Sequence, residues 1–121
     1  MTPGCVLDTN VALYALHNRL EGPLPVVDVR VSIVTEIELL GYPSATEDEL
    51  SAVRKFLGRI EIVPLGDAVK DEAIRLRRSL RVKLPDAVIL ATAVVTGSEL
   101  LTNDQELIAR AIVPCRSLRF R

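Results

Sequence analysis

The alternation of short apolar segments with segments of helical periodicity is the feature that most constrains the fold. Short segments rich in Val, Leu and Ile are predicted to form strands at 4–8, 29–32, 61–65 and 99–104. Strands that alternate with helices favour a parallel sheet covered by helices on both faces. We therefore predict an α/β fold, a three-layer α/β/α sandwich around a short, mainly parallel sheet.

The predicted helices follow from apolar spacing and from capping residues at their ends. They span residues 10–18, 33–41, 46–58, 67–81, 84–97 and 105–112. Thr9 or Asn10 is expected to cap the first helix, and Thr46 with Glu49 has the spacing of a capping box. The segment 84–97 is apolar on all sides and should be buried on the sheet. The end of the chain is predicted as a short strand or tail.

Length and composition limit the possible classes of protein. A chain of 121 residues fits one domain, 1–121, and its 49% hydrophobic content with a mean hydropathy of +0.29 argues against disorder. Aromatic residues make up only 3%, so the core must be aliphatic. The net charge of −1 excludes a uniformly basic nucleic-acid-binding chain, although a local basic patch is still possible.

The cysteines and the hydropathy profile indicate a cytoplasmic location. Cys5 and Cys115 could form at most one disulfide, and we expect reduced thiols instead. We find no signal-peptide pattern and no apolar run approaching the roughly 18 residues of a membrane span. No membrane association is therefore expected.

Four acidic residues stand where a parallel sheet would bring them together. Asp8 and Asp104 each end a predicted strand. Glu38 follows the strand end at Ser32 by six residues, and Asp86 lies in the first turn of its helix. Ligands of open parallel sheets bind beyond the carboxyl ends of the strands. We therefore expect these carboxylates to converge at that edge.

Converging carboxylates need compensation. Two unit charges about 4 Å apart repel by roughly 4 kcal/mol at an effective dielectric of about 20. Such a cluster must either take up protons or bind a divalent cation. A ligand set made only of oxygen atoms suits Mg²⁺ or Mn²⁺, whereas the cysteines and His17 lack the spacing of a zinc site.

Each acid also has a purely structural interpretation. Asp8 could be a helix N-cap, Asp86 could favour the helix dipole, and Asp104 could be a turn residue. Glu38 could be a solvated helix residue. Glu36 is its competitor, because side chains two positions apart on a helix point about 200° apart. The four positions are persuasive only as a joint pattern.

That joint pattern resembles the PIN domain family, most closely its compact VapC-type toxin branch. The matching segments are "VLDTNV" (6–11), "SIVTEIELLG" (32–41), "LPDAVILATA" (84–93) and "LLTNDQEL" (100–107). The four acids fall on the family's four acidic positions, and Asn10 and Thr102 fall on positions that support the site. Leu107 departs from the family, which often carries an aromatic residue there.

The resemblance implies a metal-dependent ribonuclease that is the toxin of a toxin–antitoxin pair. The implied ligands of Mg²⁺ or Mn²⁺ are Asp8, Glu38, Asp86 and Asp104. Such an ion lowers the pKa of bound water and so supplies a nucleophile for the phosphodiester. The resemblance further implies products with a 5′-phosphate and a 3′-hydroxyl, a cognate antitoxin as partner, and a homodimer.

An acidic site must still attract a polyanion. Segment 70–83 holds six basic and two acidic residues, and three arginines lie in the last six residues of the chain. We hypothesise that some of these contact RNA phosphates. The alternative is a solvated helix face on which Asp71 pairs with Arg75 at i, i+4.

Other classes of protein remain in competition. A haloacid-dehalogenase-like phosphatase also has an acid at a strand end, but it usually has a second acid two residues later, where this chain has Asn10. A receiver domain lacks support because the expected acid pair is missing, and no GxGxxG loop is present for a dinucleotide. A non-catalytic module could instead bind a partner peptide in an apolar groove.

Overall fold

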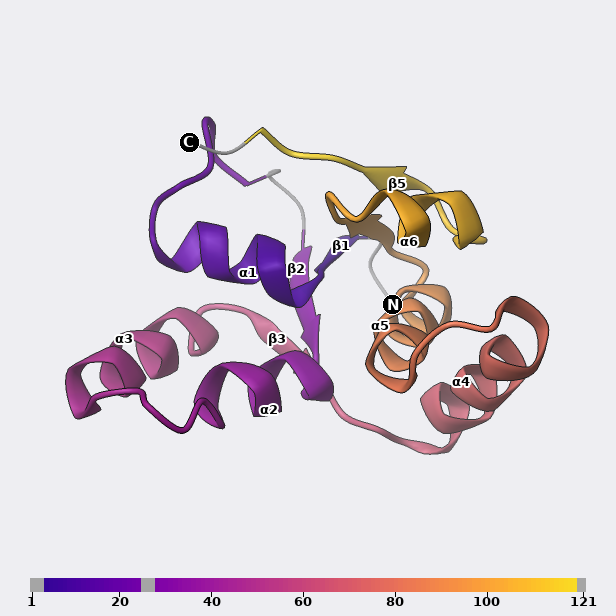
Figure 1. The fold of residues 1–121 in the computed structure, drawn as a ribbon, viewed down its shortest axis with the longest axis horizontal. Helices are drawn as coiled ribbons and strands as arrows, with labels where there is room; N and C mark the ends of the chain where they lie inside the picture. Colours follow the sequence, from indigo (N-terminus) through magenta and orange to yellow (C-terminus); the bar gives the residue numbers. More distant parts are fainter. Residues whose placement is uncertain (1–3, 25–27, 120–121) are drawn as a thin grey trace.

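A five-stranded parallel sheet forms the centre of the molecule in a computed structural model that describes residues 4–24 and 28–119 (Figure 1). The spatial strand order is β3-β2-β1-β4-β5. The strands are β1 (Gly4–Leu7), β2 (Asp28–Ser32), β3 (Glu61–Val63), β4 (Glu99–Leu101) and β5 (Cys115–Arg116). The predicted parallel sheet is therefore confirmed, and all four of its neighbouring pairs are parallel.

Helices cover both faces of this sheet, as the alternation predicted. The helices are α1 (Thr9–Leu16), α2 (Ile33–Leu40), α3 (Glu47–Leu57), α4 (Asp67–Leu80), α5 (Leu84–Thr96) and α6 (Gln105–Arg110). Figure 1 shows α1, α2 and α3 on one side of the sheet and α4, α5 and α6 on the other. Among the described residues, no helix combines the length and the apolarity that crossing a membrane would require.

The pleat of the strands divides the core into two apolar layers. Val6 and Leu100 contact the layer that contains α4 and α5. Leu7 and Leu101, one residue further along the same strands, contact the layer that contains α1, α2 and α3. Successive strand residues point to opposite faces, so both faces of β1 and β4 must be apolar. Leu107, the departure from the family pattern, is buried in the α4–α5 layer.

The first helix begins one residue earlier than predicted. Asp8, not Thr9 or Asn10, caps α1, and its Oδ1 accepts a hydrogen bond from the Val11 amide at 2.7 Å. The cap of α3 is as predicted, because Thr46 and Glu49 form both hydrogen bonds of a capping box. A carboxylate is a strong N-cap acceptor, and its negative charge also favours the helix dipole.

Three strands end earlier than predicted because polar or imino residues follow them, and the first is β1, which stops at Leu7 before Asp8. β3 stops at Val63, before Pro64, which has no amide proton for a strand ladder. β4 stops at Leu101, after which Thr102 and Asp104 make side-chain hydrogen bonds that open the turn into α6. The buried helix predicted at 84–97 is confirmed as α5, which ends at Gly97 with a φ of 63°.

Arg30 is the main exception to the apolar strands. Its side chain lies on β2 and is 2% exposed. The guanidinium donates to Glu61 at 2.6 Å and to the Ser98 hydroxyl at 3.1 Å, and it lies 3.6 Å from Asp28. A Cβ on Gly4 would lie 2.1 Å from the backbone carbonyl oxygen of Asp28 and 2.5 Å from this guanidinium, so glycine is required for the close approach of β2. Pairing and hydrogen bonding make this buried charge tolerable.

The strand order places a reversal of the chain between β1 and β4. From β1 the chain moves outward through β2 to β3, and it then returns over the sheet to start β4 on the other side of β1. At such a switch point the loops after the two central strands separate and leave a crevice. Asp8 follows β1 and Asp104 follows β4, so both acids flank this crevice.

The buried position of α5 generates a stability prediction. Leu90 is fully buried in α5, so Leu90→Ala should lower the free energy of unfolding by about 2–5 kcal/mol, through lost apolar burial and a residual cavity. Val95 lies on the same helix but is exposed, and Val95→Ala should change the free energy of unfolding by less than about 0.5 kcal/mol. Urea denaturation measures both. Equal losses would contradict the packing of α5 on the sheet.

Candidate active site

Asp8 is the most deeply buried of the four predicted acids. It lies between the ends of β1 and β4 and is only 7% exposed. One carboxylate oxygen accepts from the Val11 amide, and the other accepts a short hydrogen bond from the Thr102 hydroxyl. The amide of Asp8 donates to the Leu101 carbonyl at 3.1 Å. The structural interpretation of Asp8 as an N-cap is thus correct, and it leaves the second oxygen directed across to β4.

Thr102 connects Asp8 to Asp104. Its fully buried hydroxyl donates to Asp8 and accepts from the Asp104 amide at 3.1 Å. The Asp104 side chain is exposed, and its Oδ1 accepts from the amides of Glu106 and Leu107 at 3.0 and 3.2 Å. Asp104 therefore caps α6 in the same way that Asp8 caps α1, and both carboxylates are oriented by backbone donors.

Glu38 reaches the same edge from α2. The Thr9 hydroxyl donates to its Oε1 at 2.6 Å and lies 3.1 Å from the hydroxyl of Thr35, which is fully buried. Thr9 is the residue directly after Asp8, so this hydrogen bond joins the start of α1 to the side chain of Glu38. Glu36, its competitor, lies in the first turn of α2.

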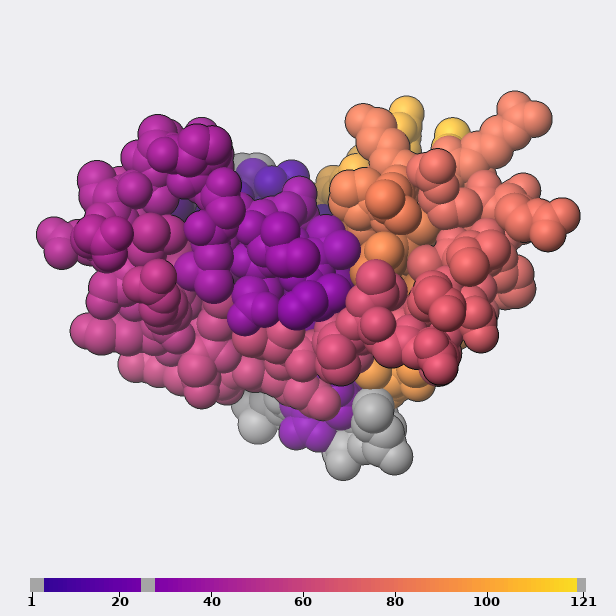
Figure 2. Space-filling model, turned by 90° about the horizontal axis from the view of Figure 1, so that it is seen from below, coloured from indigo at the N-terminus to yellow at the C-terminus, as the bar shows by residue number. Residues whose placement is uncertain are grey.

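Asp86 lies in the first turn of α5 and lines a pocket of about 290 Å³ together with Asp104. The same pocket is lined by residues of the α4–α5 turn and of α6. Figure 2 shows a hollow between the purple surface of α2 and the orange surface of the α4–α5 turn, at the upper edge of this view. Asp86, the least direct of the four placements from sequence, thus lies beside Asp104.

Electrostatic coupling shows that the acids share one environment. Burial raises the pKa of the Asp8 carboxyl, the hydrogen bonds from Thr102 and Val11 oppose this rise, and the charges of Asp104 and Asp86 add to it. Burial also raises the pKa of Asp86, with further contributions from Asp104 and Glu38 that the nearby Lys83 partly offsets. The charged forms of Asp8 and Asp86 are therefore destabilised by burial and by the acids around them.

The acids influence one another electrostatically without forming a closed ligand cluster. Within residues 4–24 and 28–119, no three acidic, histidine or cysteine side chains lie close enough together to hold one metal ion. The donors nevertheless suit a hard divalent cation, because all four are carboxylates and their charges repel. Glu38 and Asp104 have exposed side chains, which leaves them free to approach such an ion.

Two hydroxyl residues at this edge were not predicted as site residues. Thr9 was considered only as a helix cap and Thr35 only as part of a motif, yet together they orient Glu38. Asn10, predicted as a supporting residue, is exposed in α1, and its supporting role stays a prediction. The sequence did contain a signal for Thr9, because it directly follows Asp8. A residue that follows a strand-end acid lies at the same edge of the sheet as that acid.

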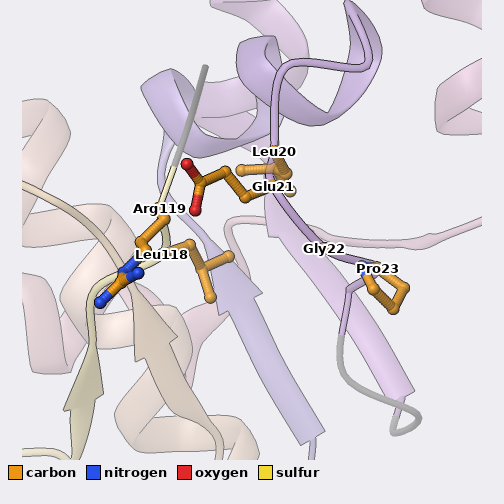
Figure 3. Close-up of a pocket in the computed structure, with 6 residues that line it drawn as sticks. All are labelled: Leu20, Glu21, Gly22, Pro23, Leu118 and Arg119. Carbon is orange, nitrogen blue, oxygen red and sulfur yellow. The ribbon is translucent and has the colours of Figure 1, made fainter.

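A second hollow of about 260 Å³ lies apart from the acids. It is formed by the segment after α1 and the segment after β5, and its lining residues are Leu20, Glu21, Gly22, Pro23, Leu118 and Arg119 (Figure 3). The Glu21 amide donates to the Arg119 carbonyl at 3.0 Å, which joins the two segments. None of the four predicted acids lines this hollow.

Comparison with known proteins identifies the family of the chain. The model of the PIN domain matches residues 5–113, which is most of the sequence. The chain therefore belongs to the PIN domain family, and the resemblance seen in its four motifs is confirmed. No curated protein gives a significant match.

Solved structures share the fold over nearly the whole chain. DNA-bound VapBC from Salmonella typhimurium matches with a TM-score of 0.80 and 20% identity, covering 94% of this chain and 97% of that chain. VapBC2 from Rickettsia felis, bound to a promoter DNA fragment, matches with a TM-score of 0.79 and 18% identity, covering 95% of this chain and 98% of that chain. A toxin–antitoxin complex from Klebsiella pneumoniae matches with a TM-score of 0.73 and 26% identity, covering 88% of this chain and 91% of that chain.

The raised pKa of Asp8 generates a pH-dependent prediction. Asp8→Asn should raise the melting temperature of the metal-free protein at pH 7, by about 3–6 °C for each kcal/mol of repulsion and desolvation relieved. Ionised Asp8 lowers stability above its raised pKa, and this cost disappears as the pH falls toward the ordinary value of about 3.9. The difference between variant and wild type should therefore shrink on acidification.

Thermal unfolding in EDTA across this pH range measures the effect. Asp71→Asn is a matched control, because Asp71 is exposed on α4 and should leave the melting temperature nearly unchanged. An Asp8→Asn variant that is less stable than wild type at pH 7 would show that the hydrogen bond from Thr102 to the carboxylate outweighs the crowding, because asparagine is an equally good N-cap.

Proposed function

We propose that this chain is a divalent-metal-dependent ribonuclease and the toxin of a toxin–antitoxin pair. The observation that carries the proposal is that, within a PIN domain, Asp8 is influenced by the charges of Asp104 and Asp86, and Asp86 by those of Asp104 and Glu38. Acids whose pKa is raised by burial and by neighbouring charges are typical of sites built for chemistry or for a cation. RNA phosphodiesters are the proposed substrate.

The proposed cofactor is Mg²⁺ or Mn²⁺, since PIN nucleases generally use divalent metal ions. Asp8 and Asp104 would be its central ligands, and Glu38 and Asp86 would complete the ligand set or orient the attacking water. When bound, the ion lowers the pKa of water and neutralises charge that develops on the phosphate.

The residues around the acids would hold them ready for this role. Thr102 and the Val11 amide fix the two oxygens of Asp8, so its carboxylate needs no rearrangement to present its free lone pairs. Thr9 similarly holds one oxygen of Glu38 and leaves the other available. Backbone donors orient one oxygen of Asp104 and leave its second oxygen available.

A cognate antitoxin and a homodimer belong to the same proposal. Toxin–antitoxin complexes are among the structures that share the fold, including the complex from Klebsiella pneumoniae at 26% identity. Several large apolar side chains are exposed, among them Ile37, Tyr42, Leu65 and Ile74, which leaves apolar surface for protein contacts. An RNA substrate and a protein antitoxin would place this activity in the cytoplasm.

The alternative function is a non-catalytic PIN-like interaction module. The same exposed apolar side chains favour it, and Asp8 and Asp104 would then serve only as helix caps. PIN family membership favours the ribonuclease over a haloacid-dehalogenase-like phosphatase. A cleavage assay separates the two remaining functions directly.

The first functional prediction concerns cleavage and its dependence on the ion. Wild-type protein should cleave single-stranded RNA with Mg²⁺ or Mn²⁺ and should stop in EDTA. Mutation of a residue that only hydrogen-bonds to a metal ligand lowers metal affinity or activity by about 10–100-fold. Asp8→Asn changes a proposed ligand itself, so it should lower the cleavage rate by more than about 100-fold. Asp71→Asn, which removes an exposed acid of α4, should cleave normally. Cleavage that persists in EDTA or in Asp8→Asn would exclude this mechanism.

The second functional prediction concerns the hydroxyl of Thr9. Thr9→Val keeps the shape of the side chain but removes the hydrogen bond to Glu38, so cleavage and apparent metal affinity should fall by about 10–100-fold. Thr9→Ser keeps the hydroxyl and should retain most of both. Initial rates across a Mn²⁺ titration measure the two effects, and equal behaviour of the two variants would argue against a role for this hydroxyl.

A further inference from the structure

The pocket beside Asp86 and Asp104 is lined by charged side chains of both signs. Its acids are Asp86, Asp104 and Glu106, and its cations are Arg81, Lys83 and Arg110, from the α4–α5 turn and from α6. Arg81 and Lys83 therefore share a pocket with two of the proposed metal ligands, whereas most of the basic segment 70–83 lies along α4.

Two arginines hold the backbone of the α4–α5 turn. Arg110 donates through Nη1 to the carbonyls of Leu80 and Arg81, at 3.2 Å each. Arg77 donates to the Val82 carbonyl, also at 3.2 Å. These bonds satisfy carbonyl groups that the end of α4 leaves without helical partners. These hydrogen bonds therefore fix the backbone from which the side chains of Arg81 and Lys83 project.

Arg81 and Lys83 are the side chains of this turn that remain available. Both are exposed, and neither forms an ion pair or a side-chain hydrogen bond with the described part of the chain. Arg75, by contrast, pairs with Glu72 rather than with Asp71 as the alternative interpretation of this segment expected. Arg81 and Lys83 are thus available cations in the same pocket as Asp86 and Asp104.

The backbone of Arg81 gives an independent reason to assign its side chain a role. Arg81 ends α4 in the left-handed conformation, with a φ of 55°. Glycine is the usual residue at such a helix end, because any Cβ is disfavoured there. A charged side chain kept where the backbone favours glycine points to a function of that side chain.

The size and lining of the pocket favour a backbone phosphate over a base. A volume of about 290 Å³ is at the lower end of the range for small-ligand sites, about 300–1,000 Å³, which suits a single nucleotide unit rather than a duplex. No aromatic side chain lines this pocket, so it lacks the stacking surface on which single-stranded bases are usually held. Two available cations instead match the charge of a phosphate.

We propose that Arg81 and Lys83 bind an RNA phosphate adjacent to the bond that the acidic site cleaves. This inference rests on the proposed ribonuclease function and adds the part of the site that holds the substrate. The two cations offset the repulsion between the carboxylates and the RNA backbone, and they direct the chain across the β1/β4 crevice. Because phosphates carry no sequence information, these residues should support binding equally for different RNA sequences.

Arg81→Gly is the sharpest test, because it removes the charge while relieving the backbone. The variant should melt at the same temperature as wild type or higher, since a φ of 55° suits glycine. RNA binding should nevertheless weaken by about threefold to tenfold at low salt, and the slope of log affinity against log salt should become shallower by about 0.7. Lys83→Gln should weaken binding similarly.

Binding is measured by fluorescence anisotropy of labelled single-stranded RNAs of several sequences, with Mg²⁺, in an Asp8→Asn background that leaves the RNA intact. Arg59→Gly is the matched control, because Arg59 is exposed in the turn between α3 and β3 and does not line this pocket. It should leave affinity and salt slope unchanged. Cleavage by Arg81→Gly in the wild-type background should show a raised KM with kcat nearly unchanged.

The outcomes separate the two proposals. If wild type cleaves RNA but Arg81→Gly and Lys83→Gln bind it as Arg59→Gly does, the phosphate contact is wrong and the ribonuclease stands. A loss of binding confined to one RNA sequence would indicate base recognition and would also overturn it. If wild type neither cleaves RNA nor binds it in a salt-dependent way, both proposals fail.

Discussion

The buried carboxylate of Asp8 is the interaction on which the rest of the site depends. One of its oxygens accepts a hydrogen bond from the first turn of α1, and the other accepts one from Thr102, which follows β4. The Thr102 hydroxyl in turn accepts a hydrogen bond from the Asp104 amide. One charged group therefore fixes both sides of the crevice at the strand reversal. Burial and neighbouring acids raise its pKa, so the bonds that order the site act against an electrostatic cost. A divalent cation would relieve that cost, which is why order and metal binding belong together in this proposal.

The fold separates the tasks of stability and chemistry. Two aliphatic layers on either side of β1 and β4 hold the sheet, and α5 is buried along most of its length. The buried guanidinium of Arg30, away from this edge, is paired with Glu61 and Ser98. At the carboxyl edge, by contrast, like charges are held near one another. Natural proteins place such local conflict at functional sites and compensate for it with a well-packed core.

Particular residues show how far sequence reasoning reached. The predicted strands, helices and capping box of Thr46 and Glu49 are present, because apolar period and cap chemistry are local properties. The N-cap of α1 was predicted at Thr9 or Asn10, with Asp8 as an alternative, because all three are good cap residues. In the structure Asp8 is the cap, and its other oxygen accepts from Thr102, which is 94 residues away in the chain. The buried Arg30 was not foreseen, since its partners Glu61 and Ser98 lie 31 and 68 residues away in the chain.

The sequence by itself determined the α/β class, the family and the four acidic candidates. The alternation of strands with helices and the positions of acids near strand ends can be recognised from residues that are close together in the chain. Only the tertiary structure decided which side chains support those acids and how close the acids come. The hydrogen bond from Thr9 to Glu38 and the position of Asp86 beside Asp104 depend on crossover connections that bring distant segments to one edge. Local periodicity specifies the elements, whereas the packing of helices on a twisted sheet sets the distances between their ends.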